Sequence, residues 1–140
     1  MRHLLSLSVA GAALAMAVAC GGGGGSSPTA PSGGGTGGTG GATSSVTITI
    51  GANGVASPST VTVTQGGRVT FVNNDSRSHD MSSDPHPSHE DCPPLAQVGF
   101  LSPGQSKTSG NLNTVRVCGF HDHNLPNSIG LQGRITIVPQ

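Results

Sequence analysis

The chain has 140 residues, among them 23 glycines and 10 prolines, and its six basic residues balance its six acidic ones. A net charge of zero argues against nucleic-acid binding, which requires a basic face. With no Trp, no Tyr and only three Phe, a folded domain has a modest hydrophobic core, which a disulfide or a metal would reinforce.

The N-terminal segment is predicted to be a signal peptide, residues 1–19. Arg2 precedes an apolar run at residues 4–18, which is too short and wrongly flanked for a transmembrane helix. The four residues AVAC that end at Cys20 resemble a bacterial lipoprotein box, with Ala17 where Leu is usual. The resemblance implies lipidation of Cys20 and attachment to a membrane of the bacterial envelope, in the periplasm or at the surface. The alternative is an ordinary Ala-x-Ala cleavage site.

A flexible tether is predicted to follow the lipidated cysteine. Residues 20–44 are almost entirely Gly, Ser, Thr, Pro and Ala, and such a composition offers no apolar surface to offset the entropy of ordering. The folded domain is therefore expected at residues 45–140.

The domain is predicted to be all-β, because apolar and polar residues alternate in short segments and no segment has helical periodicity. Five strands are expected, at 46–50, 60–64, 68–73, 115–120 and 134–138. Residues 65–67 are predicted as a turn between two of them, and residues 108–114 as a further strand and turn. Residues 74–106 are expected to form a long irregular connection, and such loops are usually functional or disordered. Short strands with frequent turns indicate a β-sandwich or barrel.

Five of the six histidines fall in two short windows, and this clustering predicts a metal site assembled from two loops. One window holds His79, His86 and His89, and the other holds His121 and His123. Imidazole is the commonest protein ligand for copper and zinc. An His-x-His pair on an extended segment places both rings on one face. Two prolines flank His86 and stiffen it.

The pattern TVTVTQGGRVTFVNND at residues 60–75, followed by His79 and by a final strand after the loop 118–132, resembles the cupredoxin family of plastocyanin-like copper proteins. The resemblance implies a Greek-key β-sandwich or barrel, with His79 as the first copper ligand. The last loop departs from the family, since no methionine follows Cys118. The length of this loop is closer to that of a plastocyanin-like ligand loop when His121 takes the position of the family's cysteine. On that alignment the loop contributes His121 and His123.

Two cysteines remain after Cys20, and their even number in an exported domain favours a Cys92–Cys118 disulfide. The bridge would be worth on the order of 3 kcal/mol on the chain-entropy model and would hold the two histidine windows together. The alternative is that Cys118 is a copper thiolate, because a residue cannot serve in both ways.

The expected metal ligands are His79, His121 and His123, with His86 as a possible fourth. His89 and Met81 are left open, and Asp122 and Asp80 are candidate hydrogen-bond partners of the ligands. A histidine site without thiolate favours Cu(II), with Zn(II) next.

The sequence thus predicts a monomeric, non-enzymatic envelope lipoprotein that captures, buffers or transfers copper, with a redox or copper-transfer protein as its partner. The main alternative is a blue copper electron carrier that uses Cys118. A copper enzyme and a metal-free interaction module are the other possibilities.

Overall fold

The computed structural model describes residues 41–140. The predicted signal peptide, the lipidation of Cys20 and most of the predicted tether lie outside the described residues. Within residues 41–140 there are eight strands and two short 3-10 helices. They are β1 (Thr43–Ile50), β2 (Ala56–Ser57), β3 (Thr60–Asn73), β4 (His79–Ser83), η1 (Pro93–Gln97), β5 (Gly99–Leu101), β6 (Ser106–Thr108), β7 (Arg116–Asp122), η2 (Ile129–Leu131) and β8 (Gly133–Val138).

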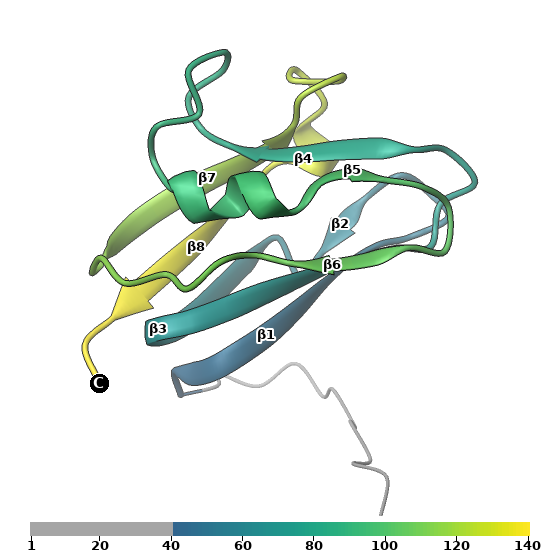
Figure 1. The fold of residues 1–140 in the computed structure, drawn as a ribbon. Helices are drawn as coiled ribbons and strands as arrows, with labels where there is room; N and C mark the ends of the chain where they lie inside the picture. Colours follow the sequence, from purple (N-terminus) through teal and green to yellow (C-terminus); the bar gives the residue numbers. More distant parts are fainter. Residues whose placement is uncertain (1–40) are drawn as a thin grey trace, which may run out of the picture. The chain divides into compact units, whose positions relative to one another are not determined.

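The strands form one hydrogen-bonded path in the order β2-β1-β3-β8-β7-β4-β5, with β6 added to β3. The pairs β1–β3 and β3–β8 are parallel, and the other pairs are antiparallel. The path folds into two layers, with β1, β3 and β6 on one side and β4, β5 and β7 on the other (Figure 1). The prediction of an all-β domain is confirmed.

The long strand β3 differs from the prediction at residues 65–67, where a turn was expected. The chain does not reverse there; one strand of 14 residues continues to Asn73. Its first half pairs with β8 and its second half with β1. Gly66 has a φ of +80°, which glycine adopts without steric cost. The glycines therefore bend the strand so that it crosses between its partners, as bulges do at the corners of β-sandwiches.

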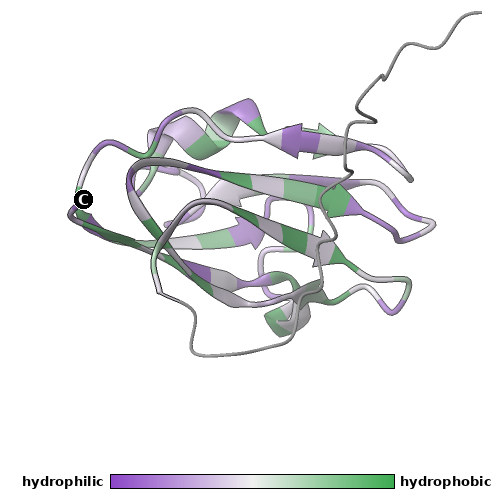
Figure 2. Cartoon of the chain, turned by 90° about the horizontal axis from the view of Figure 1, so that it is seen from below, coloured by the Kyte–Doolittle hydropathy of each residue, from purple (hydrophilic) through white to green (hydrophobic). Residues whose placement is uncertain are grey.

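The hydrophobic core lies between the layers and comes from the alternation seen in the sequence. In β3, Val61, Val63, Val69 and Phe71 are buried, while Thr62 and Thr70 between them are only partly buried. Polar and hydrophobic residues accordingly alternate along the strands in Figure 2. The rings of Phe71 and Phe120 meet edge to face with centroids 5.3 Å apart, a favoured aromatic geometry.

The segment 74–106 is more ordered than expected, because β4, η1 and β5 all lie within it. Strand β4 pairs with both β5 and β7. The irregular part that carries histidines is thus reduced to the loop 84–91, which directly follows β4. None of the helices in the described part of the chain is long and apolar enough to cross a membrane.

Candidate metal centre

The loop 84–91 is a compact, hydrogen-bonded turn that presents His86 and His89. The amide of Asp91 donates to the carbonyl of Asp84 at 2.8 Å, and the amide of His89 donates to the carbonyl of Pro85 at 2.7 Å. The hydroxyl of Ser83 donates to the carbonyl of His89 at 2.7 Å. His89 has a φ of +55°, an uncommon backbone conformation for a residue with a side chain. These contacts fix the backbone of the loop that carries both histidines.

Strand pairing brings the second histidine window to this loop. Ser82 of β4 lies opposite His121 of β7, so the loop that leaves β4 begins beside His121. Beyond β7, the amide of His123 donates to the carbonyl of Asp80 at 2.6 Å. The two loops that carry the histidines accordingly rise from the same end of the molecule (Figure 1). Register between β4 and β7 therefore decides which histidines can meet.

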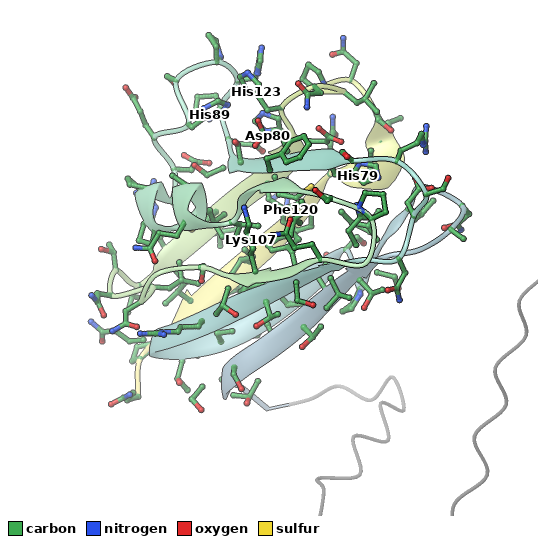
Figure 3. All side chains as sticks on the ribbon, turned by 45° about the vertical axis from the view of Figure 1, so that its right-hand side comes forward. His79, Asp80, His89, Lys107, Phe120 and His123 are labelled. Carbon is green, nitrogen blue, oxygen red and sulfur yellow. A yellow bond between two sulfur atoms is a disulfide. The ribbon has the colours of Figure 1, made fainter. Side chains whose placement is uncertain are left out.

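Four histidines converge at this end: His86, His89, His121 and His123. Each offers one ring nitrogen, and these four nitrogens all lie within 4.8 Å of one another. Nδ1 of His123 is 3.1 Å from Nε2 of His89, and Figure 3 shows these two rings together. Such convergence of ligand atoms without competing carboxylates in the group is the arrangement that a nitrogen-ligated metal requires.

His121 carries the clearest sign of a ligand position. Its ring is buried, and its Nδ1 lies 2.6 Å from Oδ1 of Asp84. A carboxylate only accepts, so Nδ1 carries a proton, and in the neutral ring the lone pair is then on Nε2. That buried Nε2 has no hydrogen-bond partner. Because buried polar atoms are rarely left unpaired, the residues fit a metal ion at this point.

The surroundings of His89 favour the neutral form of its ring, which is the form that can bind a metal. Burial lowers its pKa below the ordinary value of 6.5, and the neighbouring charges of His121, His123 and His86 lower it further. Only a neutral imidazole binds a metal, so protons and metal ions compete for the site. A lowered pKa reduces that competition at His89.

His79 was predicted as the first ligand, but the structure places it outside the four-histidine group. The ring is fully buried, with Nδ1 2.7 Å from Asp122 and Nε2 3.2 Å from Asp75. Figure 3 shows His79 apart from His89 and His123. With a carboxylate at each nitrogen, the ring has no lone pair free for a metal. His89, which the sequence left open, lies in the four-histidine group instead.

The carboxylate Asp75 holds this buried arrangement together. Burial opposes its ionisation, but hydrogen bonds from Arg77, His79 and the Ser76 amide, and the charge of Arg77, outweigh it and lower its pKa to about 2. The guanidinium of Arg77 lies 2.9 Å from Oδ2 of Asp75. These contacts anchor the start of β4.

The predicted carboxylate partners are placed differently from expectation. Asp122 does bond a histidine, but that histidine is His79, and its other oxygen accepts from the amides of Asp80 and Asn124. Asp80 contacts His123 through the backbone, where its carbonyl accepts a hydrogen bond from the amide of His123. The carboxylate that bonds a histidine of the group is Asp84. The sequence carries only a general signal for it, because Asp84 is one of five acidic residues that lie between residues 75 and 91.

Cys92 and Cys118 form a disulfide, as predicted, with Cα atoms 5.8 Å apart. Cys92 directly follows the loop 84–91, and Cys118 lies in β7, three residues before His121. The bridge therefore ties together the two segments that carry the four histidines. It also leaves no thiolate at Cys118, so the thiolate alternative does not apply. Met81 is 1% exposed and belongs to the hydrophobic core.

No family model matches the chain, and no curated protein matches it either. Solved structures do resemble it. Reduced auracyanin from Roseiflexus castenholzii aligns with a TM-score of 0.53 and 22% identity, over 71% of this chain and 100% of that one. Oxidised plastocyanin from Dryopteris crassirhizoma aligns with a TM-score of 0.51 and 20% identity, over 66% of this chain and 99% of that one.

A mutant of amicyanin in its Cu(I) form aligns with a TM-score of 0.51 and 14% identity, over 67% of this chain and 82% of that one. These likenesses show that the fold is cupredoxin-like, as the sequence resemblance implied. The four-histidine group is a feature of this chain's own loops.

Proposed function

We propose that this protein binds one copper ion through His86, His89, His121 and His123. The observation that carries the proposal is the convergence of four ring nitrogens within 4.8 Å around the buried, unpartnered Nε2 of His121. A copper ion there would satisfy that nitrogen and would cross-link the two loops. Copper bound in this way would be held by neutral imidazoles, with Asp84 as the adjacent anion.

Copper is favoured over zinc as the bound metal. Imidazole nitrogen suits both ions, but a nitrogen site generally binds Cu(II) more tightly than Zn(II). The cupredoxin-like fold supports the same choice, since the amicyanin structure that aligns with this chain is of a Cu(I) form. Zinc remains the competitor that a binding experiment must include.

The proposed role is copper capture, buffering or transfer, which is the role of a binding protein and not of an enzyme. The disulfide occupies Cys118, so the site lacks the sulfur ligand of blue copper electron carriers. His86 is the exposed member of the group and His121 the buried one. An exposed ligand at the rim can exchange with a donor or acceptor protein while the buried ligand retains the ion. A copper-transfer or redox protein is the proposed partner.

The proposal places this domain on the bacterial envelope as a monomeric lipoprotein. The supporting feature is the lipoprotein-like sequence at Cys20, followed by a tether that gives the domain reach. Replacement of Cys20 with Ala tests the anchor: the wild-type chain should fractionate with membranes and the variant should not. Equal fractionation of the two proteins would refute the anchor and leave the copper site unaffected.

Titration of the purified, oxidised protein with Cu(II), followed by visible absorption and EPR, tests the metal site. We expect one tightly bound copper with a pale, nitrogen-ligated spectrum, because no thiolate is present to produce an intense blue band. Replacement of His121 or His123 with Ala should abolish tight binding. Stoichiometric tight binding by the folded double variant would contradict the assignment.

His79→Gln is the matched control, because it removes a histidine outside the group. Glutamine can keep only one of the two hydrogen bonds that His79 makes to the buried carboxylates. We therefore expect a less stable protein that still binds one copper, as wild type does. Loss of copper from folded His79→Gln protein would return His79 to the ligand set.

A further inference from the structure

Asp84 contacts one of the four ligand histidines directly. Its Oδ1 lies 2.6 Å from Nδ1 of His121. Within residues 41–140, the other carboxylates that bond a histidine, Asp75 and Asp122, both bond His79 instead. Asp84 is therefore the one described carboxylate whose charge bears on the metal group through a hydrogen bond.

The backbone of β7 is shaped to admit this carboxylate. The amide of Asp84 donates to the carbonyl of Gly119 at 3.1 Å, and the side chain of Asp84 lies over the Cα of Gly119. A Cβ at residue 119 would overlap Oδ2 of Asp84. Gly119 and His121 face the same side of β7, because side chains alternate along a strand. The absence of a side chain at Gly119 is thus what lets Asp84 reach His121.

The bond decides which nitrogen of His121 faces the other histidines. Because a carboxylate can only accept, Nδ1 is the donor. In the neutral ring the lone pair is then on Nε2, the atom that is buried without a partner. Hydrogen bonding of this kind fixes the tautomer and ring orientation of a ligand histidine and raises its basicity. A negative charge next to a ligand also favours the more highly charged state of the metal.

We propose that Asp84, seated on Gly119, is a positioning residue that makes His121 bind copper through Nε2 and favours Cu(II) over Cu(I). This inference rests on the proposed function. It adds a residue that carries no ligand atom in the group and yet sets both the affinity for Cu(II) and the redox preference of the site.

Asp84→Asn tests the proposal, because asparagine has nearly the same shape but no charge. The purified oxidised protein is titrated with Cu(II) against a competing chelator, and the midpoint potential of the bound copper is measured. We expect one copper bound about 10- to 100-fold more weakly and a higher midpoint potential. A purely structural role would lower stability without moving the potential of the folded protein.

Glu90→Gln is the matched control, since it removes the same charge from the same loop, where Glu90 is exposed. It should leave affinity and potential unchanged. Gly119→Ala should resemble Asp84→Asn, because the new Cβ displaces the carboxylate. Thermal unfolding of each metal-free variant identifies any that fail to fold. If Gly119→Ala does not fold, the comparison of Asp84→Asn with Glu90→Gln decides the role of Asp84.

The outcomes separate this inference from the proposed function. Equal affinity and potential for wild type, Asp84→Asn and Glu90→Gln would overturn the role of Asp84, although copper binding would stand. If wild type binds no copper, the proposed function itself fails. Equal weakening by Asp84→Asn and Glu90→Gln would also overturn the inference, since general charge and not the hydrogen bond would then be responsible.

Discussion

Removal of the Cys92–Cys118 disulfide should destabilise the fold and weaken the metal site together. The two cysteines are 26 residues apart, and the chain-entropy model gives about 3.5 kcal/mol for closing a loop of that length. Small domains are typically stable by only about 5–15 kcal/mol. The bridge therefore supplies a large share of the free energy of unfolding in a domain with few aromatic residues.

The perturbation is the double variant Cys92→Ala and Cys118→Ala, which leaves no free thiol. Urea unfolding of the metal-free protein, without reductant, measures the effect. With a denaturant slope on the order of 1.5 kcal/mol/M for a domain of this size, the midpoint should fall by about 2 M. The single variants are the control, since each also removes the bridge and should unfold at a similar urea concentration.

The same double variant should bind Cu(II) more weakly, because the bridge holds the loop 84–91 against the strand that carries His121. Saturating copper should restore part of the stability: a ligand at 100 times its Kd adds about 2.7 kcal/mol. An unchanged urea midpoint, with copper affinity equal to wild type, would refute this reasoning about the disulfide.

Three further predictions concern acid stability, protonation and the core. Because the pKa of Asp75 is lowered to about 2 from its ordinary 3.8, its contribution to stability is present above about pH 4 and is lost as the pH falls toward 2. Asp75→Asn should therefore lower stability at neutral pH and flatten the acid limb of urea midpoints against pH; an unchanged limb would contradict this. In the metal-free protein, an NMR titration should place the pKa of His89 below 6.5; a value at or above it would argue against the buried, crowded ring. Phe120→Ala should cost about 3–5 kcal/mol, because Phe120 is fully buried against Phe71. Phe100→Ala, at a ring 52% exposed, should cost within about 0.5 kcal/mol, and equal losses for the two would refute the placement of the core.

Much of the fold could be predicted because its signal is local. The alternation of Val and Thr at 60–64 follows directly from the period of a strand, and these residues are in β3. The turn expected at 65–67 was wrong because a local signal cannot show how the strand is paired. A glycine pair marks a change of direction, but whether the strand reverses or bends depends on which strands lie beside it.

The metal site could be predicted only in part. Clustering of histidines in two windows pointed to His86, His121 and His123, which the structure does bring together. Residues close in sequence stay close within a short folded loop. The structure brings His89, and not His79, together with these three histidines. Both lie in the same window. His79 is buried between two carboxylates, whereas the ring of His89 lies beside that of His123.

The sequence by itself determined the all-β class, the disulfide partners and the histidine character of the candidate site, because composition, alternation and cysteine number are properties of the chain alone. Tertiary structure decided which ring nitrogens are free. The register of β4 against β7 places Asp84 beside His121, and the buried pair Asp75 and Asp122 engages His79 on both sides. Hydrogen bonds across the sheet, and not spacing along the chain, separate the environment of His79 from that of His121.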